Sequence, residues 1–176
     1  MTDTKRKPRK RTEPTGDRLT IELLILANHV EAINGLLYVS GGGWTDHFRV
    51  KTPTGAATQS YLGIGVSILV PWNETNQRHQ LAIRIENEDA TANVAQIGAE
   101  FNVGRLPTAT VGAVQHAVVA VPMALVFPAA GGYRIVAELD NGDRRQWSFR
   151  VHDIAGPMIQ MPPSGQQIPP SRGPAI

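Results

Sequence analysis

Apolar side chains recur at every second position through much of this 176-residue chain. Between His79 and Glu86, for example, Leu81, Ile83 and Ile85 alternate with polar or small neighbours. A period of two is typical of a β-strand with one buried face, because successive side chains in a strand point to opposite sides. No window of eleven or more residues shows a clean helical period of about 3.6. The pattern therefore predicts an all-β chain.

About seven to nine short strands are predicted, separated by turn residues. The candidate segments are residues 19–27, 35–40, 46–51, 58–70, 79–86, 94–103, 113–127, 133–139 and 147–151. Strands of this number and length predict a β-sandwich. Residues 28–33 are the best short helix candidate, but they are too few for a stable helix.

Two glycine-containing segments predict changes of chain direction. Asn141-Gly142 separates the last two strand candidates, and this dipeptide supplies the two positive φ angles of a two-residue type I′ hairpin turn. Gly41-Gly42-Gly43 predicts a bend or bulge after the second strand, because residues without a Cβ adopt unusual φ angles. Gly63 and Gly65, inside a strand candidate, indicate a bulge or close packing.

Charge and proline divide the chain into three parts. The formal charge is +2, yet residues 1–18 carry seven basic and three acidic side chains, whereas residues 19–153 carry nine and twelve, a formal charge of −3. Residues 154–176 contain six prolines and a single charge. The polar head and the proline-rich tail are both predicted to be disordered. One β-sandwich domain, residues 19–153, is expected between them.

Composition and motifs argue against an enzyme. The chain has no cysteine, which excludes disulfides, thiolate nucleophiles and cysteine zinc sites. The nucleophile-elbow pattern and the phosphate loop are absent, and no two histidines stand two or four residues apart. The sequence therefore predicts no catalytic, cofactor-binding or metal-binding residue. A metal-dependent hydrolase built from distant histidines and acidic residues is the least supported alternative.

Two acidic clusters leave calcium binding open as an alternative. Residues 86–89 follow a strand and residues 140–143 form the predicted turn, and both supply the oxygen ligands that calcium prefers. Neither cluster has the EF-hand pattern, and turn chemistry already explains the second. No stretch reaches the ~20 apolar residues that span a bilayer. A cytoplasmic location without a membrane span is the expectation.

The basic head is a candidate contact for an anionic partner. It places six cations within seven residues, namely Lys5, Arg6, Lys7, Arg9, Lys10 and Arg11. Such a run binds the phosphates of nucleic acid without sequence preference, because it contains no aromatic side chain that could stack on a base. The alternative is a solvated tail that aids solubility.

Two tryptophans are candidate contacts for a protein partner. Trp44 follows the glycine run and Trp72 follows Pro71, so both stand beside turn residues. Tryptophan beside an exposed loop anchors partners in many interfaces. The alternative is that each ring caps the core of the sandwich.

Several segments together carry a resemblance to a known family. They are Leu36-Leu37-Tyr38-Val39-Ser40-Gly41-Gly42-Gly43-Trp44, Val70-Pro71-Trp72-Asn73-Glu74-Thr75-Asn76, Phe127-Pro128, Gly132-Tyr133-Arg134 and Phe149-Arg150-Val151. With them, residues 19–152 resemble a family of uncharacterised bacterial single-domain proteins. The resemblance implies an immunoglobulin-like or related antiparallel β-sandwich. It implies no activity and no site residues.

The sequence thus favours a non-enzymatic β-sandwich module that acts by protein–protein interaction or assembly. Open sheets expose unpaired backbone groups, so exposed strand edges and the loops around Trp44 and Trp72 are the expected contacts. The expected partner is another protein or a second copy of the chain, with no small-molecule substrate. A nucleic-acid-associated protein that binds phosphates through its basic head is the alternative.

Overall fold

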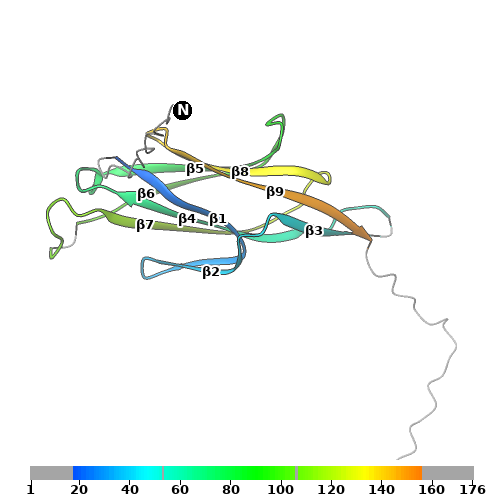
Figure 1. Ribbon diagram of the computed structural model, residues 1–176, viewed down its shortest axis with the longest axis horizontal. Coiled ribbons are helices and arrows are strands. Elements are labelled where there is room, and N and C mark those ends of the chain that lie inside the picture. The colour runs from blue at the N-terminus through cyan, green and yellow to red at the C-terminus, as the bar shows by residue number, and fades with distance from the viewer. Residues whose placement is uncertain (1–17, 53, 106, 156–176) are drawn as a thin grey trace, which may run out of the picture.

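The computed structural model describes residues 18–52, 54–105 and 107–155 (Figure 1). Nine strands in these residues form two sheets that pack against each other, and the described residues contain one 3-10 turn, Trp72–Glu74, and no α-helix. The predicted all-β class is confirmed. Its finer assignment as immunoglobulin-like stays a prediction.

The first sheet has four strands and is antiparallel throughout. Its order is β2-β1-β4-β7. The strands are β1 (Thr20–Ile33), β2 (Leu36–Gly42), β4 (Ser60–Val70) and β7 (Gln115–Leu125). Pro122 lies inside β7 without dividing it, which is tolerated because β7 is an edge strand.

The second sheet has five strands, in the order β3-β9-β8-β5-β6. They are β3 (Asp46–Lys51), β5 (Arg78–Asn87), β6 (Asn93–Asn102), β8 (Gly131–Leu139) and β9 (Arg144–Ala155). The pair β3 and β9 is parallel and the other pairs are antiparallel. The antiparallel sandwich that the sequence predicts therefore contains one parallel pair, because β3 crosses over from the first sheet and joins the last strand.

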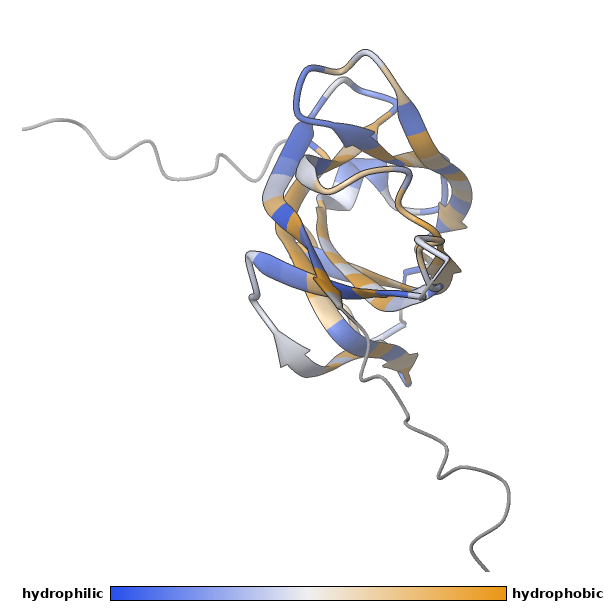
Figure 2. Ribbon diagram, turned by 90° about the vertical axis from the view of Figure 1, so that its right-hand side faces the viewer, coloured by the Kyte–Doolittle hydropathy of each residue, from blue (hydrophilic) through white to orange (hydrophobic). Residues whose placement is uncertain are grey.

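The inner faces of the two sheets form one apolar core. Viewed from the end, the strands enclose a single interior, and hydrophobic and hydrophilic segments alternate along them (Figure 2). The alternation predicted for β5 is confirmed, since Leu81, Ile83 and Ile85 are each about 1% exposed. The largest fully buried side chains of both sheets and their loops include Ile21, Leu26, Ile64, Ile68, Phe127 and Ile135. Burial of each contributes about 1.5–3 kcal/mol.

The hairpin of β8 and β9 is confirmed, but its predicted turn type is wrong. Of the residues Asn141 and Gly142, only Gly142 has a positive φ, +83°. The Gly142 N–H donates to the Leu139 carbonyl at 2.9 Å, and the Leu139 N–H donates to the Asp143 carbonyl at 2.9 Å. These bonds close a three-residue loop, a type I turn followed by a left-handed glycine, in place of the two-residue type I′ turn.

Contacts with the opposite sheet explain the longer loop. The Asn141 side-chain amide donates to the Leu19 carbonyl at 2.8 Å. The Ile21 N–H donates to the Asp143 carboxylate at 2.7 Å. The polar side chains of the longer loop thus hold the beginning of β1 against the second sheet.

A second Asn-Gly hairpin, which the sequence analysis did not predict, joins β1 to β2. Asn34 and Gly35 have φ angles of +52° and +76°, and Ile33 pairs with Leu36 across them. This is the two-residue type I′ turn. Residues 28–33, which are too few for a stable helix, belong to β1, and pairing with β2 satisfies the backbone of this segment.

The part of β1 that pairs with β2 bends away from β4, so that β2 and this part of β1 lie beneath β4 and β7. Residues 20–27 pair with β4, whereas residues 27–33 pair with β2. In Figure 1 the resulting hairpin hangs below β4 and β7, and its tip points towards the end of the molecule where β1 begins. We call residues 27–42 the β1–β2 hairpin.

Glycines allow this close approach. A Cβ on Gly65 of β4 lies 3.0 Å from Leu37 Cδ2 and 3.0 Å from Ile25 Cγ2, so glycine leaves the room that the hairpin occupies. The close packing predicted for the glycines of β4 is confirmed here. Gly41 and Gly43 have φ angles of +62° and +87°, and the chain passes there from the first sheet to the second, as the glycine run predicts.

The predicted head and tail fall almost entirely outside the described residues. β9 continues to Ala155, two residues past the predicted end of the domain. Residues 1–17 and 156–176, with the basic run and most of the proline-rich segment, lie outside the described part of the chain.

Candidate functional site

A groove separates the β1–β2 hairpin from the outer face of the first sheet. Its volume is about 640 Å³, and it is mainly apolar. Apolar walls come from Leu23, Leu36, Leu37, Val39 and Val118, polar groups from Glu22, Ser67 and His116, and Gly35 stands at the hairpin tip. We call this space the hairpin groove.

A β-bulge turns Glu22 into the groove. Ile21 pairs with Ile68 and Leu23 with Ser67, so Glu22 is the extra residue between two consecutive pairs. Glu22 and Leu23 are consequently both exposed on the outer face. Bulges re-aim side chains in this way. The carboxylate of Glu22 thereby enters a wall that a regular strand would have left apolar.

Three strands bring their polar side chains together at this point. Ser67 Oγ of β4 donates to Glu22 Oε2 at 3.2 Å, and His116 Nδ1 of β7 lies 3.4 Å from the same oxygen. A nucleophile–base–acid triad needs the serine hydroxyl to bond the imidazole. Here the serine bonds the acid, so the three groups form a carboxylate site with two neighbours and not a triad.

The hairpin also exposes apolar side chains to solvent, both on the groove wall and beyond it. Leu36 is 59% exposed, Tyr38 51% and Ile33 45%. Isolated exposed apolar residues are ordinary on a surface, whereas a contiguous group marks an interaction site. Ile33 pairs with Leu36 across the turn, so the exposed group is contiguous with the groove wall.

The free edge of β2 borders the same groove. In the described part of the chain no strand pairs with β2 on the side away from β1. Its seven residues include no charged residue and no proline. The other edge strands carry features that discourage pairing, Pro122 in β7, Arg49 and Lys51 in β3 and Glu100 in β6.

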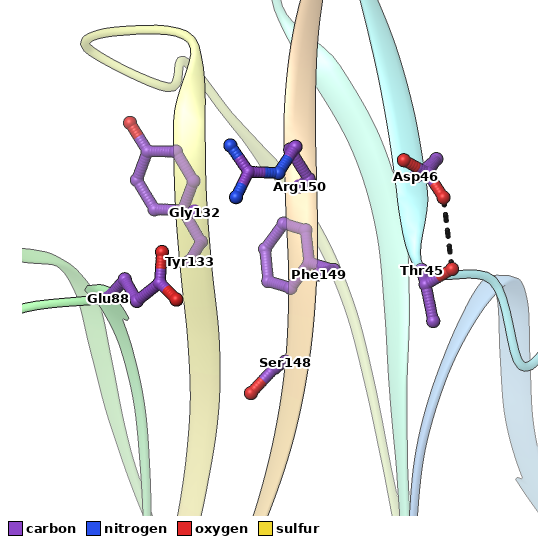
Figure 3. Close-up of a pocket in the computed structure, with 8 residues that line it drawn as sticks. All are labelled: Thr45, Asp46, Glu88, Gly132, Tyr133, Ser148, Phe149 and Arg150. Carbon is purple, nitrogen blue, oxygen red and sulfur yellow. Dashed lines mark hydrogen bonds between the residues drawn. The ribbon is translucent and has the colours of Figure 1, made fainter.

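A second, smaller cavity of about 290 Å³ lies on the second sheet beside β3 (Figure 3). Glu88 and Arg150 both reach over Gly132, where a Cβ would collide with the Glu88 carboxylate. On the other side of Arg150, Asp46 accepts a hydrogen bond from Thr45 Oγ1 at 3.0 Å. This cavity lacks the apolar walls of the hairpin groove.

Asp46 beside this cavity is held ionised. His152 Nε2 lies 2.7 Å from its Oδ1, and this hydrogen bond, followed by that from Thr45, lowers the pKa of the Asp46 carboxyl. Phe48 stacks on His152 with ring centroids 5.1 Å apart. The polar groups of these side chains bond one another along the parallel pair of β3 and β9, so few hydrogen-bonding groups remain for a ligand.

Trp44, a predicted partner contact, is half-buried against the core. Its ring stacks on His47 with centroids 5.4 Å apart and meets Phe149 edge-on at 5.8 Å. Burial lowers the pKa of His47. Trp44 Nε1 is buried and has no hydrogen-bond partner among the described residues.

Trp72, the other predicted contact, is half-buried at the far end of β4. The Arg105 guanidinium lies 4.4 Å from its ring centroid and donates to the Trp72 carbonyl at 2.8 Å. His47, which stacks on Trp44, bonds Ser60 at the beginning of β4, whereas Trp72 follows its end. An 11-residue strand makes this separation about 30 Å. The structure does not bring the two tryptophans to one surface.

The remaining residues predicted as sites are the acidic clusters, which the structure describes, and the basic head, which it does not. Within the described ranges, no group of three or more histidine, aspartate and glutamate side chains is placed to hold a metal ion. Glu86 accepts from Arg134 Nε at 2.6 Å, and Asp140 accepts from the Gln80 N–H at 3.1 Å. The residues Lys5, Arg6, Lys7, Arg9, Lys10 and Arg11 lie outside the described part of the chain, so their contact with nucleic acid stays a prediction.

The hairpin groove was not predicted from the sequence. The hairpin could have been predicted from Asn34-Gly35, because this dipeptide between two apolar runs is a strong indication of a β-hairpin. The convergence of Glu22, Ser67 and His116 had no such signal, because it depends on a bulge and on the order of strands in the sheet.

These observations define an all-β domain of two sheets with an apolar groove beneath a folded-back hairpin. Residues 22–152 match the model of a family of unknown function, DUF6941, and the chain belongs to this family. The predicted membership of a family without assigned function is confirmed. No curated protein matches the chain. In the residues that the structure describes, no helix is both long and apolar enough to cross a membrane.

Proposed function

We propose that this domain is a non-enzymatic interaction module and that the hairpin groove is where it contacts a partner protein. The observation that carries the proposal is the combination of an apolar groove with exposed Leu36 and Tyr38 on the same hairpin. Apolar side chains that a domain leaves exposed in a contiguous group gain free energy when a partner covers them.

The groove supports binding better than it supports chemistry. Its one serine donates to Glu22 and is not aligned with His116 as a nucleophile. Aromatic and aliphatic anchors in a groove with a few polar groups at its border are the usual anatomy of an interface centre.

Site-specific photocrosslinking tests the proposal. A photoreactive residue replaces Leu36 in the full-length chain, and the protein is irradiated in an extract of the cells that produce it. We expect discrete covalent adducts, because Leu36 lies at the groove wall and is exposed. The mass and peptide map of each adduct identify the contacted chain.

The matched control places the same photoreactive residue at Tyr61, which is 72% exposed and does not line the groove. Adducts at position 36 that are missing at position 61 support the proposed function. Equal adducts at both positions, or none at position 36, would overturn it.

A further inference from the structure

We infer that the occupant of the hairpin groove is an extended segment of another protein, which pairs with the free edge of β2 and places a lysine or arginine side chain on Glu22. This inference rests on the proposed function and names the chemistry of its partner.

The backbone of β2 is ready to accept another strand. A two-residue turn closes on a hydrogen-bonded pair, here Ile33 and Leu36, and the residues that bond to β1 then alternate along β2. Leu37 and Val39 consequently direct their N–H and C=O groups away from β1. An extended segment satisfies these groups by β-strand addition, the recognition mode of several peptide-binding domains.

The side chains of the groove select what such a segment carries. In a strand every second side chain faces the same side, so alternate residues of the added segment contact Leu23 and Val118 on the sheet. Apolar residues are favoured at those positions. The groove therefore fits a segment with alternating apolar side chains.

The charge of the groove selects a cation. Glu22 is the carboxylate among the groove residues, and one of its oxygens, Oε2, is bonded by Ser67 and approached by His116. A carboxylate accepts further hydrogen bonds at its second oxygen. A basic side chain of the partner complements this charge, and an acidic one is repelled.

The composition of the chain's own ends disfavours them as occupants. Residues 1–17 contain cations but only Met1 as a large apolar side chain, and residues 156–176 contain apolar residues interrupted by six prolines. Proline has no N–H to donate to β2. A second copy of the chain is an outcome that the experiment below separates.

An array of capped nonapeptides tests the inference. Each peptide alternates valine and threonine, so that the valines share one face, and one valine is replaced by lysine, glutamate or glutamine, because the charged side chain has to lie on the face that meets Glu22. The probe is the purified full-length chain. We expect lysine peptides to retain about fivefold more protein than the corresponding glutamate peptides, the size of effect that one exposed charge pair and its reversal produce.

Charge reversal supplies the decisive control. Glu22→Lys is expected to invert the preference, so that glutamate peptides retain more protein than lysine peptides. Glu31→Lys makes the same change of charge on β1, beside His29 at 3.0 Å, outside the groove, and is expected to leave the lysine preference unchanged. Urea denaturation of both variants confirms that they are folded.

The outcomes separate the inference from the proposed function. Equal retention of lysine and glutamate peptides, or equal effects of the two substitutions, would overturn the inference, and adducts at position 36 would still support the proposed function. Light scattering that detects a dimer of the full-length chain, dissociated by Leu36→Asp, would assign the groove to a second copy and also overturn it.

Discussion

The strands β2 and β3 follow each other in the chain, and each forms an edge of one sheet. They differ in how that edge is used. β3 turns a charged side chain inwards and is bonded to the last strand, whereas β2 carries no charge and presents apolar side chains to solvent. The difference indicates that the fold depends on the edge strand β3 and leaves the edge of β2 unprotected.

The inward side chain of β3 is Arg49, which is 4% exposed. It donates to Asp153 of β9 and to the Phe127 carbonyl, and Lys51 adds a second cation 2.6 Å from the same carboxylate. Buried charges of this kind are stable only when they are fully paired. The parallel pair of β3 and β9 is therefore held by charge as well as by backbone hydrogen bonds.

Among the substitutions that test this comparison, Arg49→Met is expected to have the largest effect on stability. The substitution leaves the Phe127 carbonyl without its arginine donor and leaves the Asp153 carboxylate with Lys51 alone, and we expect it to lower the free energy of unfolding by about 3 kcal/mol. Urea denaturation measures the change. Arg150→Met, on the exposed face of β9, is the control and is expected to change it by less than about 0.5 kcal/mol. Equal effects would show that β3 is not held by its buried arginine.

A smaller effect is expected from Gly63→Ala, which tests how the β1–β2 hairpin is seated. The added Cβ lies 2.8 Å from Val30 Cγ2 and 2.9 Å from the Val30 nitrogen, so the hairpin must shift. Overpacking of this kind costs about 1–3 kcal/mol. We also expect faster chymotryptic cleavage after Tyr38, because the displaced hairpin is more accessible.

Gly98→Ala on β6 is the control for this substitution, because no atom lies within 4 Å of the added Cβ. It is expected to leave both the unfolding free energy and the cleavage rate close to those of the unmodified chain. If Gly63→Ala behaves in the same way, the hairpin does not depend on the glycines of β4.

A pH dependence is expected at β3 and not at β2. The hydrogen bond from Arg49, followed by that from Lys51, lowers the pKa of Asp153 to about 2 from its ordinary value of 3.8. A carboxyl with a lowered pKa in the folded state contributes stability that is complete above about pH 4 and is lost as the pH falls towards 2. We therefore expect the urea midpoint to fall across this range, and to fall less in Asp153→Asn. An equal fall in both proteins would assign the acid sensitivity to other carboxyls.

Some structural features of the two sheets can be predicted from the sequence and others cannot. The alternation of Leu81, Ile83 and Ile85 predicts β5 because burial on one face requires it, and the structure agrees. The hairpin of β8 and β9 is equally readable. Its turn type is not, because Asn141 bonds to Leu19 and Asp143 to Ile21 of β1, more than a hundred residues earlier in the chain.

The candidate site is harder to predict from the sequence than the fold. Glu22, Ser67 and His116 are far apart in sequence, and they meet because β4 lies between β1 and β7. The bulge that turns Glu22 outwards leaves no pattern in residues 19–27 that a period of two detects. Trp44 and Trp72 were predicted from local context alone, and the structure places them beside opposite ends of β4, an 11-residue strand about 30 Å long.

The smallest effect is expected from Leu36→Ser and Tyr38→Ser, and it is the one that most sharpens the contrast between the two edges. Both side chains are more than half exposed, so the fold loses little buried apolar area with them. We expect each substitution to change the unfolding free energy by less than about 0.5 kcal/mol, as surface substitutions do. A loss above about 1 kcal/mol would mean that β2, like β3, serves the fold. An unchanged stability would show that the domain does not depend on these two apolar side chains, as the proposed function requires of side chains that a partner covers on an unprotected edge.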